Sequence, residues 1–465
     1  MDELCTKTAG ELAHLVATGA TTSTEVVEAH LARIAEVNDH CNAVTRVLAD
    51  EARASAAAVD AAVADGETLG PLAGVPCTVK ENLDLAGTPT TQGLPVFAEL
   101  VAPTDAPLVE RIRAAGAIPI ARTNLPELGL RITTDNPLHG LTRNPWHPDR
   151  TAGGSSGGEG SAIASGMSPL GLGNDIGGSL RNPAFCCGIA SLKPTHARLP
   201  SYSAFEHDQN PGLAAQVMHA DGPMARSVAD LRLALEVLHG RDPRDPRSVT
   251  APLDGPDVPR RAAVVRSLPE VDVDPSVTAG VDTAAAALAD AGWEVVEAAP
   301  PEIGYCTDLW AHLLAADVAD VMAVARTILS AELADVLDTL AGDYSADSMA
   351  PGLVHAETAR LARLWALFFV DHPVLVMPTW TRPQPMHGFD LDLDARDETT
   401  ALLSCITPPN LLGLPSVAVP VGVADGLPQG VQCVADQWRD DLALAAAADV
   451  EAAVGTITPI DPVTA

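Results

Sequence analysis

The stretch GGSSGGEGSAIASGMSPLGLGNDIGGS, residues 153–179, contains two serines in glycine-rich surroundings, Ser155 and Ser179. Between them, residues 158–173 predict a helix that runs through a turn into a strand, and this strand leads directly to the second serine. Two such sites so close together raise the question of what each serine does.

The segments around this stretch alternate between strand and helix patterns. Apolar strands are predicted at 74–80, which ends on Lys80, and at 117–123, after a helix at 105–116. A strand, helix, strand unit follows at 260–299, with further strands at 372–380 and 415–423 and a closing helix at 440–454. This order predicts an α/β fold, a large twisted mixed sheet with helices on both faces.

We expect the 465 residues to form a single domain. Helices are expected to fill residues 1–65, where Thr22 and Ser23 offer a capping start. Residues 66–200 would form the catalytic core, and 201–465 the rest of the sheet and the helices of a substrate pocket. Residues 200–260, rich in Pro, Asp and Arg, are expected to form surface structure around a helix at 227–240.

Composition excludes several classes of function. The formal net charge of −33 argues against a nucleic-acid partner, which would need a concentrated basic surface. No export signal or membrane span is evident, so a soluble cytoplasmic protein is expected. The eight cysteines form no C-x-x-C pair and are expected to be buried thiols, and no metal motif is present.

Two local explanations of GGSSGG are weak. A phosphate loop needs Lys and Ser/Thr after its last glycine, whereas Glu159 follows Gly158 here. Residues 153–157 satisfy the G-x-S-x-G nucleophile elbow, but the preceding RNPWHPDRTA does not read as the strand that an elbow requires. A Ser-His-Asp hydrolase, with His372 among several possible bases, stays as a minority alternative.

The third explanation uses both serines. Residues 153–200 closely resemble the signature segment of the amidase signature family, and the Glu after the glycines looks most like the fatty acid amide hydrolase branch. The resemblance extends to PLAGVPCTVKENLDLAGTPTTQG upstream and PPNLLGLPSVAVPVG near the C-terminus, and is least clear at 300–370. It implies the amidase signature fold and cofactor-free amide hydrolysis.

The resemblance also implies a Ser-Ser-Lys triad. Ser179 matches the nucleophile, Ser155 the bridging serine and Lys80 the base. The backbone N–H groups of Ile176, Gly177, Gly178 and Ser179 would form the oxyanion hole, and the Gly154–Ser155 peptide would be cis. A lysine acts as a base only when its amine is neutral, so Lys80 is expected in a buried polar pocket that lowers its pKa.

Other residues at family positions are assigned supporting roles. Ser156, Asp175 and Arg181 are expected to form hydrogen bonds around the triad, and Lys193 to support the fold. Ala152 and Asn174 depart from the usual proline and threonine, which could alter the shape of the site. Leu130 and Arg131 are expected to bind substrate. Arg131 would contact an anionic or strongly polar group of the substrate. Trp310, Trp380 and Phe205 are further candidates for the pocket lining.

The sequence therefore predicts an amidase that cleaves a small-molecule carboxylic amide through an acyl-serine intermediate. Esters, hydrazides or carbamates could react on the same scaffold. A second class is the glutaminase-type subunit of a tRNA-dependent amidotransferase, although residues 401–405, ALLSC, carry no charge where a recognition acid is expected. A third is a non-catalytic scaffold, which the filled triad does not favour. The sequence leaves a monomer or a homodimer open.

Overall fold

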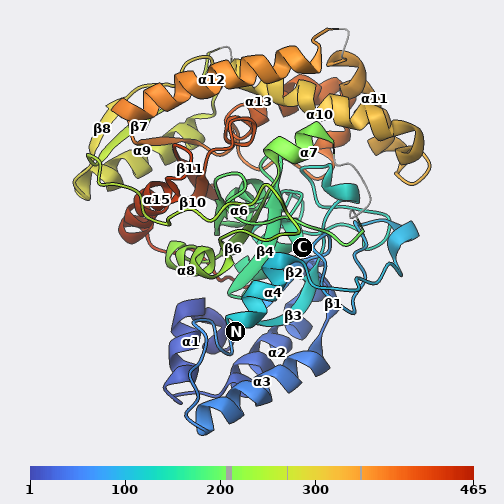
Figure 1. Cartoon of the computed structure of the whole chain (residues 1–465), viewed down its shortest axis with the longest axis vertical. Helices are drawn as coiled ribbons and strands as arrows, with labels where there is room; N and C mark the ends of the chain where they lie inside the picture. Colours follow the sequence, from blue (N-terminus) through green and yellow to red (C-terminus); the bar gives the residue numbers. More distant parts are fainter. Residues whose placement is uncertain (206–211, 270, 346–347, 465) are drawn as a thin grey trace.

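The structure is a computed structural model, and it describes residues 1–205, 212–269, 271–345 and 348–464. In these residues an 11-stranded mixed sheet runs through the molecule in the order β1-β3-β2-β4-β6-β5-β10-β11-β9-β7-β8 (Figure 1). The strands are β1 (Val44–Val47), β2 (Pro76–Lys80), β3 (Ile118–Thr123), β4 (Leu170–Asp175), β5 (Ala190–Lys193), β6 (Ala220–Ala225), β7 (Arg261–Val264), β8 (Glu294–Glu297), β9 (Val374–Pro378), β10 (Ser416–Ala424) and β11 (Leu427–Ala435).

Helices pack on both faces of this sheet, which confirms the predicted fold class. They are α1 (Ala9–Ala17), α2 (Ser23–Cys41), α3 (Ala49–Ala64), α4 (Pro107–Ala114), α5 (Gly157–Ala164), α6 (Arg181–Cys187), α7 (Leu213–Met218), α8 (Val228–Leu238), α9 (Pro275–Asp290), α10 (Ile303–Ala325), α11 (Ala331–Asp343), α12 (Pro351–Asp371), α13 (Arg396–Leu403), α14 (Pro408–Leu411) and α15 (Asp440–Val454).

The alternation of side chains along each strand decides which residues face which layer. On β2, Cys77 and Val79 join the large apolar core that also contains residues of α4, α8, α9 and α15. Thr78 and Lys80 therefore point to the opposite face, where α5 packs against β2, β3 and β4. This period of two places the lysine on the same side of the sheet as the helix that follows Ser155.

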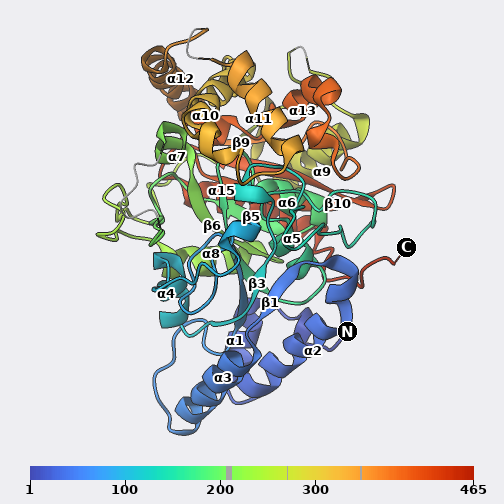
Figure 2. The same cartoon turned by 90° about the vertical axis from the view of Figure 1, so that its right-hand side faces the viewer.

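The two ends of the molecule carry different helices (Figures 1 and 2). The N-terminal helices α1, α2 and α3 lie at one end, and α10, α11, α12 and α13 gather at the other. Helix α2 begins with a capping box in which Thr22 Oγ1 accepts from the Glu25 N–H and the Glu25 carboxylate accepts from the Thr22 N–H. Of the two residues that the sequence indicated, Thr22 is the N-cap and Ser23 is the first residue of the helix.

Several expectations need correction. Residues 1–65 are not only helices, because β1 adds an edge strand beside β3. Residues 200–260 are not only surface structure, because β6 is buried and pairs with β4 and β5 inside the sheet. All eight cysteines are buried and free, as expected.

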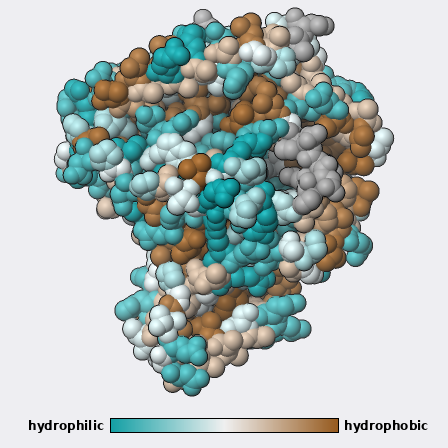
Figure 3. Space-filling view, viewed as in Figure 1, coloured by the Kyte–Doolittle hydropathy of each residue, from teal (hydrophilic) through white to brown (hydrophobic). Residues whose placement is uncertain are grey.

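The outer surface shown in Figure 3 is mixed. Hydrophilic residues gather near the centre of this face, and hydrophobic residues form separate patches around them. None of the helices built from the described residues combines the length and the apolar character needed to cross a membrane.

Candidate active site

Lys80 ends β2 and is fully buried. Its Nζ lies 2.7 Å from Ser155 Oγ and 2.8 Å from Asn174 Oδ1, and Asn82 Nδ2 donates to the same Asn174 oxygen over 3.2 Å. Burial lowers the pKa of the Lys80 ammonium to about 7, although Asp175, Asp221 and Glu159 each work to raise it. The amine can therefore be neutral near physiological pH.

Ser155 lies in the loop before α5 and is 2% exposed. The Gly154–Ser155 peptide bond is cis, as the family resemblance implies. Gly153 has φ +78°, a conformation that glycine adopts readily and other residues rarely do. The Ser155 hydroxyl is thus buried in contact with the Lys80 amine.

Ser179 lies in the turn between β4 and α6 and is 5% exposed. Its carbonyl accepts a hydrogen bond from the Ser156 N–H at 3.2 Å, which joins the two serine loops. In the described part of the chain, no hydrogen bond connects the Ser155 and Ser179 hydroxyls. Catalytic hydrogen bonds without substrate are often long and tighten when substrate binds.

The loop before Ser179 carries the backbone donors expected to stabilise an oxyanion. The Gly178 N–H already donates to Asp175 Oδ1 at 2.7 Å, whereas no described residue accepts from the N–H groups of Ile176, Gly177 or Ser179. Trp310 fixes this loop, because its Nε1 donates to the Ile176 carbonyl at 2.7 Å and its ring lies where a Cβ on Gly177 would be. Of the four donors expected from the sequence, three are therefore unpaired among the described residues, whereas Gly178 is already engaged.

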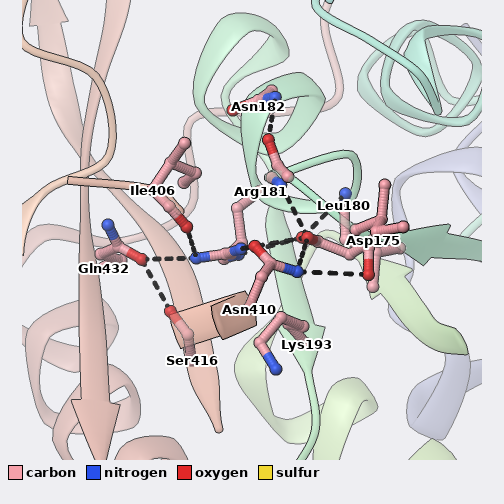
Figure 4. A network of polar contacts seen from close by, with 12 residues as sticks. Asp175, Leu180, Arg181, Asn182, Lys193, Ile406, Asn410, Ser416 and Gln432 are labelled. Atoms are coloured by element: carbon pink, nitrogen blue, oxygen red, sulfur yellow. Dashed lines mark hydrogen bonds and ion pairs between the residues drawn. The ribbon is translucent and has the colours of Figure 1, made fainter. Parts of the chain in front are cut away.

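A buried ionic network supports this loop from behind (Figure 4). Arg181 donates through Nε and one terminal nitrogen to both Asp175 oxygens, each at 3.0 Å, and reaches Gln432 and Asn410 with the remaining donors. Burial works to raise the pKa of the Asp175 carboxyl, but the Arg181 guanidinium, with Lys193 and the Asn410 amide, outweighs this and holds the pKa well below its usual range. Asp175 is therefore an anion that orders residues 178–181.

Ser156 and Lys193 differ in their contacts. The Ser156 hydroxyl lies 3.5 Å from the Asn174 carbonyl oxygen and makes only a weak contact. Lys193 lies beside the network of Figure 4, and its Nζ donates to the Pro194 carbonyl at 3.0 Å. Burial, together with the nearby Arg181 charge, lowers the pKa of Lys193 to about 7.

Two cavities meet at Ser179. The first cavity, about 470 Å³, is lined by Ile176 and Gly177 and by apolar residues of the helices that cap this end. These are Trp310, Ala311 and Leu314 of α10, Leu333, Leu337 and Leu340 of α11, and Leu403 of α13. The second cavity, about 440 Å³, is more polar and is lined by Asn82, Ser155, Asn174 and Asp221. Gly129, Leu130, Ile176 and Ser179 border both cavities.

The residues predicted to contact substrate lie in different places. Leu130 and Trp310 line the first cavity, whereas Trp380 is fully buried and donates to Asn182 Oδ1 at 2.7 Å. Neither cavity includes Phe205 among its described lining residues. Arg131 also borders the first cavity, but its guanidinium binds the Asp390 carboxylate at 3.0 Å, and both side chains are buried. The charge of Arg131 is therefore matched within the protein.

Several residues of the site were not identified from sequence. Asn174, noted only as a departure from the family, contacts Lys80 directly. Asn410 and Gln432 bind Arg181 from more than 200 positions away, so no local pattern announces them. Glu159 directly follows GGSSGG, and a charged residue in this otherwise apolar helix is a sequence signal for a role in the site. The described residues contain no group of three or more His, Cys, Asp or Glu side chains arranged to hold a metal ion.

Comparison with known proteins finds one matching family and several relatives. The amidase family model matches residues 25–444. An indoleacetamide hydrolase from Bradyrhizobium diazoefficiens is 41% identical, with 96% of this chain and 86% of the relative covered. A glutamyl-tRNA(Gln) amidotransferase component from Salinispora arenicola is 33% identical, with 99% of each chain covered.

A solved structure extends the comparison to the fold. The structure of 6-aminohexanoate cyclic dimer hydrolase in complex with its substrate superposes with a TM-score of 0.83 at 29% identity. It covers 98% of this chain and 98% of its own. The likeness therefore includes the whole sheet and the helices around it.

Proposed function

This chain belongs to the amidase signature family and hydrolyses amides, and from that premise we propose that Ser179 is the nucleophile, activated by Lys80 through Ser155. The observation that carries the proposal is the buried contact of Lys80 Nζ with Ser155 Oγ, in a loop joined to that of Ser179. A neutral Lys80 amine can accept the Ser155 proton while its own N–H donates to Asn174.

The reaction begins with attack on the amide carbonyl. Ser179 Oγ forms a bond to the carbonyl carbon as its proton passes to Ser155, and the Ser155 proton passes to Lys80 Nζ. The carbonyl π electrons move onto oxygen, where the N–H groups of Ile176, Gly177 and Ser179 stabilise the charge. Asp175 supports this step because it fixes the turn through the Gly178 N–H.

Collapse of the tetrahedral intermediate reverses the relay. The carbonyl re-forms, the C–N bond breaks, and the leaving nitrogen takes a proton from Ser155, which recovers one from Lys80. Ser155 borders the second cavity, so the proton would be delivered on that side. Water entering the same side then attacks the acyl-Ser179 ester by the same relay and releases the acid.

The two cavities support an assignment of the substrate halves. The first cavity has an apolar wall, and both arginines among its described lining residues are paired, Arg131 with Asp390 and Arg396 with Asp343. It suits an uncharged, apolar acyl group, and its volume lies within the usual range of about 300–1,000 Å³ for small-molecule sites. We propose that the substrate is a neutral arylacetamide. Indoleacetamide, which appears in the name of one relative, belongs to this class.

Labelling by a fluorophosphonate tests the nucleophile. Wild-type protein should be labelled at Ser179, and Ser179→Ala should lose both the label and amide hydrolysis, by about 10⁴-fold or more. Lys80→Met should retain the fold and lose activity to a similar extent. Label at Ser155, or undiminished turnover of Lys80→Met, would contradict the assignment.

A glutaminase assay separates the amidotransferase alternative. Free glutamine carries an ammonium and a carboxylate, and its carboxylate would have to displace a protein carboxylate from Arg131 or Arg396, the two arginines that line the first cavity. We expect kcat/KM for indoleacetamide to exceed that for glutamine by about 100-fold or more, the value of leaving buried charged groups poorly paired. A preference for glutamine would favour the amidotransferase alternative instead.

A further inference from the structure

A buried carboxylate lies beneath the proposed base. Glu159 occupies the first turn of α5, four positions after Ser155, and is fully buried. Its Oε2 accepts from Thr78 Oγ1 at 2.5 Å and its Oε1 from Thr123 Oγ1 at 2.7 Å. Each carboxylate oxygen is thus held by one hydroxyl.

The sheet is adapted to this carboxylate on three adjacent strands. Thr78 shares the face of β2 with Lys80, and Thr123 of β3 is the register partner of Lys80. On β4, Gly171 pairs with Thr78, and a Cβ at Gly171 would come within 2.1 Å of Glu159 Oε2. The hydroxyls of Thr78 and Thr123 therefore bind the Glu159 carboxylate, and the absence of a side chain at Gly171 leaves space for it beside the base.

The other acids that face Lys80 are already paired with cationic or ionisable groups. Asp175 of β4 binds Arg181, and Asp221 of β6 lies 3.3 Å from His219 Nε2. Glu159 differs, because among the described residues no Arg, Lys or His side chain hydrogen-bonds to it. Arg122 of β3 acts on it only at longer range, since its guanidinium bonds to Thr88 and to the carbonyls of Lys80 and Leu83. The Glu159 carboxylate also acts on the Cys77 thiol of β2. Burial raises the pKa of this thiol to about 12, and the charge of Glu159 adds to this effect.

We propose that Glu159 is a positioning residue for the reaction, the buried counter-charge that stabilises the Lys80 ammonium while the relay holds the proton. The inference rests on the proposed function. When Ser179 attacks, its proton reaches Lys80 by way of Ser155, so a positive charge appears on a fully buried side chain. An isolated buried ammonium is costly, and an anion on the neighbouring helix offsets this cost.

Burial raises the pKa of the Glu159 carboxyl to about 7, against the opposing effects of its threonine donors and Lys80. The N-terminal position in α5 favours the anion. Glu159 Oε1 binds the hydroxyl of Thr123, the register partner of Lys80, so the two charges interact and each favours the ionised form of the other.

The experiment is the pH dependence of kcat/KM with one amide substrate. In wild-type enzyme the rate should rise with pH through about 7, because Lys80 must lose its proton. Glu159→Gln removes one of the three negative charges that raise the pKa of Lys80, so the acid limb should move to lower pH, by up to about one unit. The rate at the plateau should fall by about tenfold, since the ammonium loses its counter-charge.

Glu81→Gln is the matched control. Glu81 follows Lys80 directly, is buried, and also accepts from two threonines, Thr45 and Thr91, but it pairs with His139. It is not among the groups that mainly shift the pKa of Lys80, which are Asp175, Asp221 and Glu159. Its substitution should leave the position of the acid limb unchanged, even if stability falls.

Thr123→Val provides a second variant if Glu159→Gln does not fold. Removing one donor raises the pKa of Glu159, so less anion faces Lys80 and the acid limb should move in the same direction by less. Glu159→Asp keeps the charge and should hold the limb closer to wild type. An unmoved limb in folded Glu159→Gln overturns the inference while leaving the triad intact. Activity in Ser179→Ala would instead reject the proposed function itself.

Discussion

Individual residues of this site act through charges that are buried and matched. Asp175 and Arg181 are both fully buried and meet through two contacts of 3.0 Å. Removing one member of such a pair leaves the other uncompensated and typically costs about 3–5 kcal/mol. The pair is therefore as important for the fold as for the position of Ser179.

The substitution Asp175→Asn should lower the free energy of unfolding by about 3 kcal/mol or more, because it leaves the Arg181 guanidinium without its anion. Urea denaturation followed by circular dichroism measures this. Glu398→Gln is the control, since Glu398 pairs with Arg382 at the surface, where both side chains are exposed, and should change stability by about 1 kcal/mol or less. Equal effects of the two substitutions would show that the buried pair has no special role.

At the scale of elements, helix α5 depends on glycine to approach the sheet. A Cβ on Gly158 would lie 2.4 Å from the Asn124 backbone nitrogen, and one on Gly157 would lie 2.3 Å from Thr134 Oγ1. The glycines of GGSSGG therefore serve close packing as well as the backbone turn. Because Ser155 lies two residues before this helix, a displacement of α5 would also move the Ser155 hydroxyl.

Gly158→Ala should force α5 away from β3, lower the melting temperature and reduce kcat by about 100-fold, as expected when a catalytic group moves by about 1 Å. Gly304→Ala in α10 is the matched control, because nothing lies within 4 Å of its added Cβ. It should keep full activity and gain up to about 1 kcal/mol in stability. Melting curves and amide hydrolysis report both effects, and full activity in Gly158→Ala would contradict the packing argument.

The elements found from sequence are those whose pattern is local. Strands β2, β4 and β10 are apolar runs, and they lie where the sequence predicts them. Strand β6, ADGPMA, was missed because Asp221, Gly222 and Pro223 are typical of a loop. It is a strand because β4 and β5 pair with it on both sides, and a Cβ at Gly222 would meet the Leu192 carbonyl at 2.2 Å.

The residues of the site likewise divide into those that stand in a local motif and those that do not. Lys80, Ser155 and Ser179 were assigned because they stand in long motifs that resemble a known family. Gln432 could not be assigned, because its role arises only when β11 brings it to Arg181 across 251 positions of sequence. Non-local pairing of this kind leaves no periodic signal.

The whole molecule carries a large excess of negative charge. Its 61 acidic residues face 28 basic ones, for a formal net charge of −33. Many of the arginines form surface pairs, such as Arg232 with Glu236 and Arg266 with Asp282, and each such pair contributes about 0–1 kcal/mol. The unmatched acids repel one another, and this repulsion opposes the compact state.

Salt should therefore stabilise the protein. The screening length falls from about 30 Å at 0.01 M salt to about 10 Å at 0.1 M, so repulsion between distant acids weakens more than attraction within close pairs. We expect the melting temperature, measured by calorimetry in NaCl, to rise steeply up to about 0.3 M and then to level off. A continued linear rise in proportion to salt would indicate ion exclusion from the surface instead of screening. A fall in melting temperature over the same range would mean that the surface ion pairs outweigh the repulsion of the unmatched acids.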